Sequence, residues 1–169
     1  MCTHAQKSIR IIQPYVQPID ELESALGDAL DRGVQVEIVS ARNRDQPAYK
    51  SLLNSDLFYK LSKKGAVIYE EPFKFLHMKA IEVDDGEQIT IGSFNQDAWS
   101  FYCNNEANLF LRRHKSQETH RQFMRVFEGL KREGRLVDFR ESYTTGGYIE
   151  VTFWKLCLGF SHWIANNRK

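Results

Sequence analysis

The 169-residue sequence predicts a mixed α/β (α+β mixed sheet) domain in which helices cover both faces of one sheet. Short apolar runs alternate with helical patterns through about the first seventy residues, which is the order of a β-α-β-α-β unit with parallel strands. From residue 77 the hydrophobic period changes to two, which indicates a β-hairpin. We therefore expect a parallel unit whose sheet is extended by an antiparallel hairpin.

The first half of the chain contains five predicted elements. Ser8–Ile12 is rich in isoleucine and predicts a short buried strand. In the helix that follows, Asp20 and Glu23 form a capping-box pattern and Gly33 supplies the C-terminal stop. The other predicted elements are a strand at Val34–Ser40, a helix at about Ala48–Lys63 and a strand at Gly65–Tyr69.

The second half begins with the hairpin. Asp85-Gly86 is a strong turn signal between two alternating strands, the first starting at His77 and the second at Gln88. Because alternate side chains share a face of a strand, we expect one face of the hairpin to gather four polar side chains. These are His77, Lys79, Ser93 and Asn95. The remaining predicted elements are a strand at Glu106–Arg112 and a helix at about Ser116–Glu133.

The length fits one domain, which we place at residues 1–140. Residues 141–169 form the most apolar segment. It is interrupted by Lys155 and His162 and is too short to cross a bilayer, so an interfacial or core-capping helix is expected.

Composition limits the possible functions. The net charge of +1 argues against a purely electrostatic nucleic-acid binder. Residues 1–111 hold 11 basic and 16 acidic side chains, whereas residues 112–140 hold 9 and 4. This basic segment is either a solvated helix face or a surface that meets an anion such as a lipid headgroup. Three cysteines without metal-like spacing indicate a reducing or cytosolic environment.

The polar residues of the hairpin have the chemistry needed to act on a phosphate ester. The imidazole of His77 can attack phosphorus and form a covalent intermediate. Lys79 supplies a cation for the phosphoryl oxygens, and Ser93 and Asn95 supply neutral donors. Glu106 is a carboxylate that can orient the histidine. This set requires no metal or cofactor, and the sequence offers no carboxylate cluster that would hold a metal.

The order of these residues resembles the HKD motif of the phospholipase D superfamily. His77-x-Lys79 is followed by Asp84 and by Gly92-Ser93-x-Asn95. The extended form of the motif continues at matching offsets with Asp97, Ser100, Asn104 and Glu106. The segment that begins SIRIIQPYVQP is similar to the opening of the second HKD half of cardiolipin synthases.

The resemblance implies a role for each motif residue. His77 would be the nucleophile or the general acid, and Lys79, Ser93 and Asn95 would bind the phosphate. Glu106 would hydrogen-bond His77 and fix its tautomer. Asp84 belongs to the catalytic motif, but its strand parity places it away from His77 and favours a structural salt bridge or hydrogen bond.

Two features complete the expected site. The family usually has six residues between the motif aspartate and glycine, but here there are seven, so either Asp84 or Asp85 fills the motif position. Tyr15 and Trp99 are possible pocket residues: Tyr15 follows the first strand, and Trp99 stands where relatives often carry arginine.

The superfamily builds one active site from two such motifs, and this chain has one. The second is expected from a missing N-terminal half or from a homodimer partner. The resemblance implies a membrane-associated, cardiolipin synthase-like phosphatidyltransferase acting on phospholipid through a phosphohistidine. The alternatives are a phospholipid hydrolase, a single-motif homodimeric endonuclease and a non-catalytic binding module, with nucleic acid the less favoured substrate.

Overall fold

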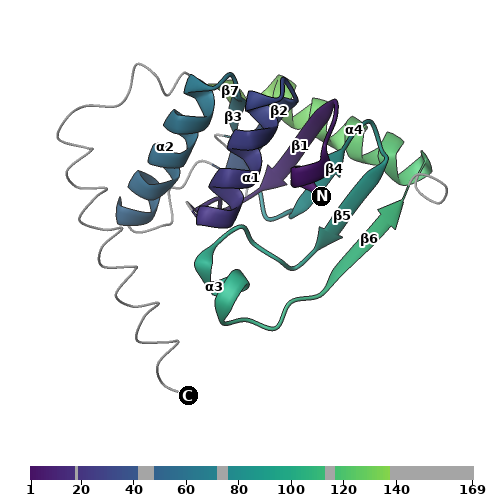
Figure 1. Ribbon diagram of the computed structural model, residues 1–169. Helices are drawn as coiled ribbons and strands as arrows, with labels where there is room; N and C mark the ends of the chain where they lie inside the picture. The colour runs from purple at the N-terminus through teal and green to yellow at the C-terminus, as the bar shows by residue number, and fades with distance from the viewer. Residues whose placement is uncertain (18, 42–47, 72–75, 113–116, 138–169) are drawn as a thin grey trace.

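A computed structural model describes residues 1–17, 19–41, 48–71, 76–112 and 117–137. Its centre is a seven-stranded sheet in the order β6-β5-β4-β1-β2-β3-β7 (Figure 1). The first half of the chain supplies β1 (Ser8–Gln13), α1 (Asp20–Asp31), β2 (Gln35–Ala41), α2 (Ala48–Lys63) and β3 (Val67–Glu71). The second half supplies β4 (Ala80–Val83), β5 (Gln88–Gly92), α3 (Ala98–Tyr102), β6 (Asn108–Arg112), α4 (Gln117–Glu133) and β7 (Arg135–Leu136).

The strand pairing confirms the predicted combination of a parallel unit and a hairpin. β1 pairs with β2 and β2 with β3 in parallel, whereas β4 pairs antiparallel with both β1 and β5. β6 and β7 close the two edges in antiparallel pairing. The predicted fold class is therefore confirmed.

Helices cover both faces, as the sequence predicts. One buried cluster contains Ile11, Ile38 and Leu26 and joins β1 and β2 to α1. The cluster on the other face contains Ile12 and Val39, and Phe123 and Phe127 of α4 close it. Successive residues of β1 and β2 thus alternate between two apolar layers, as expected for strands buried on both sides. Figure 1 shows α1 and α2 on one side of the sheet and α4 on the other.

Two local predictions were wrong. Asp20 does not cap α1, because the N-cap is Ile19 and makes no side-chain hydrogen bond. Glu23 does not complete a capping box, and its carboxylate lies 2.5 Å from the ammonium of Lys60 on α2. The strand expected from His77 begins at Ala80, so His77 and Lys79 lie in the segment that leads into β4. Gly33 does end α1 and has a φ of 85°.

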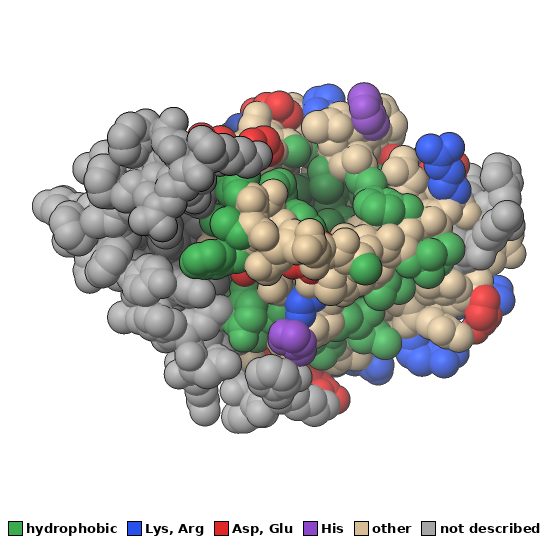
Figure 2. Space-filling view, turned by 90° about the horizontal axis from the view of Figure 1, so that it is seen from below, with side chains coloured by type: hydrophobic (Ala, Val, Ile, Leu, Met, Phe, Trp, Pro, Cys, Tyr) green, Lys and Arg blue, Asp and Glu red, His purple; other side chains and the backbone are tan. Residues whose placement is uncertain are grey.

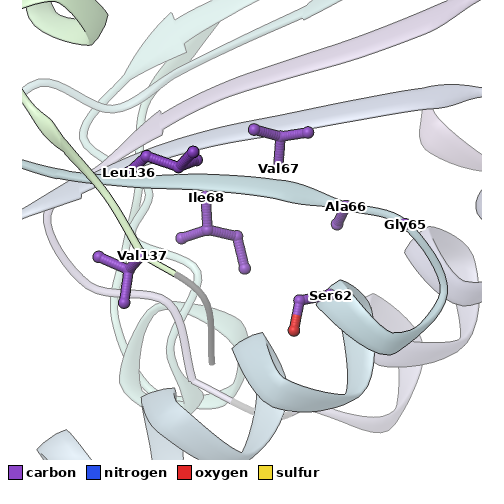
Figure 3. Close-up of a pocket in the computed structure, with 7 residues that line it drawn as sticks. All are labelled: Ser62, Gly65, Ala66, Val67, Ile68, Leu136 and Val137. Carbon is purple, nitrogen blue, oxygen red and sulfur yellow. The ribbon is translucent and has the colours of Figure 1, made fainter. Parts of the chain in front are cut away.

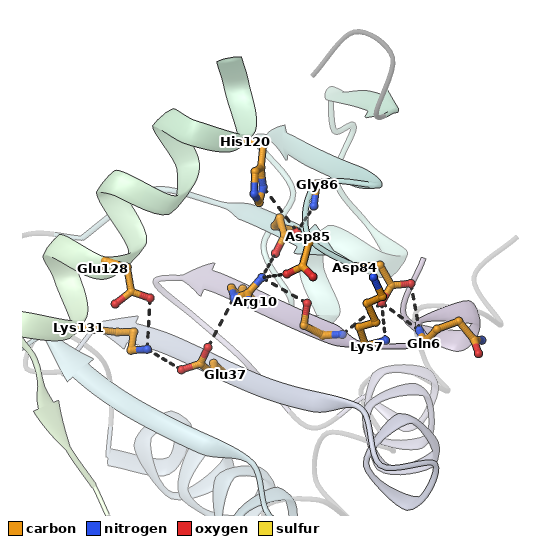
Figure 4. A network of polar contacts seen from close by, with 12 residues as sticks. Gln6, Lys7, Arg10, Glu37, Asp84, Asp85, Gly86, His120, Glu128 and Lys131 are labelled. Atoms are coloured by element: carbon orange, nitrogen blue, oxygen red, sulfur yellow. Dashed lines mark hydrogen bonds and ion pairs between the residues drawn. The ribbon is translucent and has the colours of Figure 1, made fainter. Parts of the chain in front are cut away.

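A network of charged residues lies between the centre of the sheet and α4 (Figure 4). The carboxylate of Glu82 is fully buried, and its Oε2 lies 2.8 Å from the guanidinium of Arg10. Arg10 also reaches Asp85 in the hairpin turn and Glu37 on β2. Lys131 of α4 contacts Glu37 at 2.6 Å and so joins the helix to the network. Sequence reasoning missed this set of contacts.

The predicted C-terminal segment, residues 141–169, lies outside the described residues. Among the residues that are described, no helix has both the length and the apolar character needed to cross a bilayer.

Candidate active site

Lys79 is held just before β4 in a largely dehydrated position. Its side chain is 7% exposed, and its backbone carbonyl accepts a 3.2 Å hydrogen bond from the N–H of Gly92. The ammonium donates to the backbone carbonyl of His77 at 2.8 Å. Burial lowers the pKa of Lys79, and the negative charges of Glu106 and Asp97 partly oppose that shift. The site therefore contains a buried cation close to two carboxylates.

His77 is exposed and lies beside Tyr15. The two rings meet edge to face, with centroids 6.4 Å apart. Tyr15 is brought there because the chain after β1 runs beside the chain after β5, through a parallel bridge between Val16 and Gln96. The structure thus places the predicted pocket residue Tyr15 next to the predicted nucleophile. Figure 2 shows one face of the molecule, on which a histidine lies next to a lysine or arginine with hydrophobic side chains nearby.

Ser93 and Glu106 form the second part of the site. The Ser93 hydroxyl donates a short hydrogen bond to the Glu106 carboxylate and accepts one from the N–H of Ala107 at 3.0 Å. Glu106 also accepts from the Ser100 hydroxyl at 2.7 Å and from the Asn104 amide at 3.3 Å. The hydrogen bonds from Ser93 and Ser100 hold the pKa of Glu106 below its usual value. Glu106 is thereby kept ionised and fixed in place.

The short helix α3 supports this carboxylate. Asp97 is its N-cap and accepts a 2.9 Å hydrogen bond from the N–H of Ser100. The Ser100 hydroxyl faces the site, where it accepts from the N–H of Asn95 at 3.2 Å while donating to Glu106. The sequence matched Asp97 and Ser100 to the motif without predicting a helix. The spacing Asp97-x-x-Ser100 is an N-cap signal that could have revealed it.

Asn95, which is predicted to donate a hydrogen bond to the phosphate, is half-buried. The oxygen of its side-chain amide is buried and has no hydrogen-bond partner among the described residues. Nearby, the Gln13 amide at the end of β1 donates to the carbonyl of Phe94 at 3.2 Å and so fixes the segment between Ser93 and Asn95. Sequence reasoning missed Gln13, although a polar residue at the carboxyl end of an apolar parallel strand is a signal for a site.

The predicted gathering of four side chains on one face of the hairpin is wrong. The register pairs Ala80 with Ile91 and Ile81 with Thr90. Directly opposed residues of two paired strands point to the same face of the sheet, so Ile91 shares a face with Ala80. Ile81 and Lys79 belong to the opposite face. The polar groups meet beyond the strand ends instead, where the segments before β4 and after β5 leave the regular pleat.

Asp84 lies at the opposite end of β4 from Lys79. Its carboxylate accepts hydrogen bonds from the backbone N–H groups of Gln6, Lys7 and Ser8, the shortest being 2.7 Å from Lys7. Burial would raise the pKa of Asp84, but these hydrogen bonds outweigh it and hold the pKa below the usual value. The structure thus gives Asp84 the hydrogen bonding that strand parity predicted, and it does not bring Asp84 together with the other motif residues.

Two other assignments remain predictions. The hydrogen bond that the imidazole N–H of His77 is expected to donate to Glu106 is not among the three side-chain contacts that the structure gives Glu106. A carboxylate has about four acceptor positions, so one is left for a further donor. Trp99 lies on α3 with 60% of its surface exposed, and its place in the pocket remains a prediction.

A separate cavity lies at the other end of the strand order. It is lined by residues of α2, β3 and β7 and has a volume of about 230 Å³ (Figure 3). Its walls carry little chemistry, since Ser62 is the only lining residue with a polar side chain. We therefore place the candidate active site at the end of β5 and α3.

Comparison with known proteins gives a consistent picture. Residues 1–131 match a family model described as cardiolipin synthase, PLD-like domain. Over 119 residues the chain is 40% identical to a cardiolipin synthase of Halalkalibacterium halodurans, an alignment that covers 70% of this chain and 23% of that protein. A cardiolipin synthase of Geobacillus is 39% identical over 111 residues, or 66% of this chain and 22% of that protein. The chain thus spans about a quarter of the length of these relatives.

Solved structures agree on the fold. The phospholipase D family member Nuc from Salmonella typhimurium matches with a TM-score of 0.70 and 21% identity, covering 80% of this chain and 85% of that chain. A phosphatidylserine synthase from Haemophilus influenzae matches with a TM-score of 0.68 and 18% identity, covering 94% of this chain and 41% of that chain.

Proposed function

The chain belongs to the family described as cardiolipin synthase, PLD-like domain, and we propose that it forms half of a phosphatidyltransferase active site. The observation that carries this proposal is the exposed side chain of His77 on a residue whose backbone carbonyl accepts a hydrogen bond from the buried Lys79. An exposed imidazole can reach a phosphorus atom, and a buried cation stabilises charge on the phosphoryl oxygens more strongly than a hydrated one.

The reaction follows from the chemistry of these groups. One ring nitrogen of His77 attacks the phosphorus of a phospholipid, and the bond from phosphorus to the headgroup oxygen breaks. The leaving alkoxide takes a proton from a second histidine, leaving a phosphatidyl group on His77. That second histidine then removes the proton of an acceptor alcohol, whose oxygen attacks phosphorus and releases His77.

Each remaining residue has a proposed part in these steps. Lys79, Ser93 and Asn95 hold the phosphoryl oxygens. Glu106 keeps the Ser93 hydroxyl oriented and, through its remaining acceptor position, fixes the tautomer of His77. Tyr15 restricts the imidazole from one side. Asp84 acts through the fold, because it ties the start of β1 to the hairpin turn.

The second histidine is proposed to come from another HKD half. It is supplied either by an N-terminal half of a longer protein or by a second copy of this chain. The substrate would be a phospholipid at a membrane surface, since a phosphatidyl group is presented there.

The test is transfer of a phosphatidyl group by the protein, combined with its companion half where one exists. Phosphatidylglycerol in detergent micelles is supplied in buffer with EDTA, and products are separated by mass spectrometry. We expect cardiolipin and glycerol, and we expect His77→Ala to reduce their formation by at least about a thousandfold. Release of phosphatidic acid instead would identify a hydrolase, and an unchanged rate in His77→Ala would contradict the assignment of His77.

The nuclease alternative is tested in the same way. Nuc is a chain of similar length, and 85% of it aligns with this one. Plasmid DNA replaces the lipid, and transfer to lipid alcohols without cleavage of DNA is the expected pattern. Cleavage of DNA that is lost in His77→Ala, with no lipid product, would reverse the assignment.

A further inference from the structure

A second cavity borders the candidate active site on the α1 side of the sheet. Its volume is about 230 Å³. Its walls come from the first three residues of the chain, α1, β4, the segment after β5, and α3. Most of the lining side chains are apolar, among them Leu22, Ala25, Ile81, Phe94 and Phe101, and the polar ones are Thr3, Glu21 and Gln96. A smaller apolar cavity of ~150 Å³ already binds benzene. The space is therefore suited to an apolar group.

One polar side chain in the wall of this cavity, Gln96, carries a buried atom that lacks a partner within the described part of the chain. Gln96 is only 2% exposed, and its backbone carbonyl is used by the N–H of Gln17 at 2.7 Å. The oxygen of its side-chain amide is buried and has no hydrogen bond among the described residues. A buried polar atom of this kind is normally satisfied by a bound group or an ordered water. The cavity therefore combines mostly apolar walls with one buried amide oxygen that has no hydrogen-bond partner among the described residues.

The cavity and the active site share the same short stretches of chain. Phe94 stands between Ser93 and Asn95, and Gln96 follows Asn95 directly. Phe101 follows Ser100 and packs edge to face on Phe94, with ring centroids 4.9 Å apart. A group that fills the cavity thus presses on the backbone that positions the phosphate-binding side chains.

We propose that this cavity binds an acyl chain of a lipid, with Gln96 bonding to the glycerol end of that chain. The glycerol end carries ester carbonyls and, in many lipids, a hydroxyl. The Gln96 amide can accept from the hydroxyl or, turned by 180°, donate to the carbonyl. This inference rests on the proposed function, since a site that acts on phospholipid phosphate brings acyl chains into this neighbourhood.

Direct labelling tests the proposal without any need for turnover. The probe is a monoacylglycerol with a photoreactive diazirine in its acyl chain, irradiated with the full-length protein. Peptides that carry the label are then identified by mass spectrometry. We expect label on peptides containing Leu22, Phe94 or Phe101, and the same label in the His77→Ala variant. Labelling that persists when transfer fails separates this proposal from the proposed function.

Two variants make the test specific to the cavity. Ala25→Trp fills the space and should reduce labelling at least tenfold, whereas Ala25→Ser keeps the space and should leave labelling unchanged. Gln96→Leu leaves the walls apolar but removes the polar position. It should lower the affinity for monoacylglycerol relative to an alkane of equal carbon number, and circular dichroism checks that each variant is folded.

Labelling that is absent, or unchanged in folded Ala25→Trp, would overturn the proposal. A rival occupant is another segment of polypeptide, either from this chain or from a second copy. A photoreactive benzoylphenylalanine at position 101 would then cross-link to polypeptide in the absence of lipid. That result would also overturn the lipid assignment.

Discussion

The hydroxyl of Ser100 lies 2.7 Å from Oε1 of Glu106, so a five-residue helix and the segment before β6 are joined through one carboxylate. The same hydroxyl accepts from the N–H of Asn95. Ser100 is 4% exposed, which keeps water from replacing either contact. Ser100 therefore connects Asn95, which is predicted to bind the phosphate, to the carboxylate of Glu106, which holds Ser93.

Replacement of Ser100 by alanine should loosen Glu106 and raise its pKa. Two hydroxyl donors lower that pKa in the wild type, and the variant loses one of them. An NMR titration of the Glu106 carboxyl should move to higher pH, and kcat/KM for phosphatidyl transfer should fall about tenfold. Ser100→Thr keeps a hydroxyl and serves as the control. A titration that does not move in Ser100→Ala would contradict this account.

Lys79 should govern the alkaline side of the activity profile. Because burial lowers its pKa, the charged form is lost at a pH below the ordinary lysine value of about 10.4. Transfer should therefore decline as the pH rises through that lowered pKa. Lys79→Met should reduce kcat/KM by about 10²–10³, the usual loss for one donor to a charged transition state.

Lys79→Arg tests whether the alkaline decline comes from loss of the proton of Lys79, because arginine keeps the positive charge but does not titrate in this range. A guanidinium stays protonated throughout the accessible range, so the alkaline decline should shift to higher pH even if the rate at neutral pH is reduced. Identical alkaline profiles for the wild type and Lys79→Arg would show that another group titrates there.

The fold could be predicted from the sequence because the sequence patterns that indicate its strands, helices and turns are local. Isoleucine-rich runs, helical periodicity and the Asp85-Gly86 turn each act over a few residues, and the matching elements all formed. The arrangement of the site residues could not be predicted, because irregular backbone outside the strands determines where they lie. Parity placed Lys79 and Ser93 on one face, but the register of β4 and β5 places them on different faces. The polar groups approach only beyond the strand ends, and no period in the sequence describes that region.

The buried charges were missed for a related reason. Arg10 and Glu82 are 72 residues apart in sequence and meet only because β1 pairs with β4. Within its own strand each reads as an ordinary exposed polar position. Contacts that depend on strand order could be predicted only after the topology was known.

Gly92 should tolerate no side chain, although its backbone is not strained. A Cβ at this position would overlap the side-chain oxygen of Asn108 and the backbone carbonyl of Ala107. Gly92→Ala should therefore push β6 away from β5, lower the free energy of unfolding by about 1–3 kcal/mol and displace Glu106. Urea denaturation measures the loss.

Gly129 on α4 is the matched control. Nothing lies within 4 Å of a Cβ placed there. Gly129→Ala should raise the free energy of unfolding by about 0.5–1 kcal/mol, because alanine favours a helix interior. If both substitutions changed the free energy of unfolding equally, the close contact of residue 92 with Ala107 and Asn108 would not determine the stability.

Asp84 should stabilise the fold in a pH-dependent way. Its pKa is lower in the folded state than the value of about 3.9 expected after unfolding, so its contribution is present above about pH 4. That contribution is lost as the pH falls through the folded-state pKa. Asp84→Asn should lower the free energy of unfolding by about 1 kcal/mol at pH 7, a value reduced for partial exposure.

Asparagine is a clean replacement because it also tolerates the φ of 55° that Asp84 adopts. The difference between the wild type and Asp84→Asn should shrink in urea titrations as the pH falls below about 4 and Asp84 becomes protonated in the folded state. Asp85→Asn is the comparison, since that carboxylate is 56% exposed and its ion pair with Arg10 should contribute less. A difference at Asp84 that persists at low pH would point to packing instead of charge.

Glu82 should be far more important for stability than the surface ion pairs. Its carboxylate is fully buried against Arg10, which is itself 14% exposed. Glu82→Ala leaves that guanidinium with only weaker partners and should lower the free energy of unfolding by about 3 kcal/mol. The exposed pair of Lys64 and Asp31 has a shorter separation of 2.6 Å, yet Asp31→Ala should cost less than about 1 kcal/mol. The double variant Arg10→Met, Glu82→Leu should recover most of the loss, because neither buried position then carries a charge. If Glu82→Ala and Asp31→Ala had equal effects in urea denaturation, burial would not control the strength of these pairs.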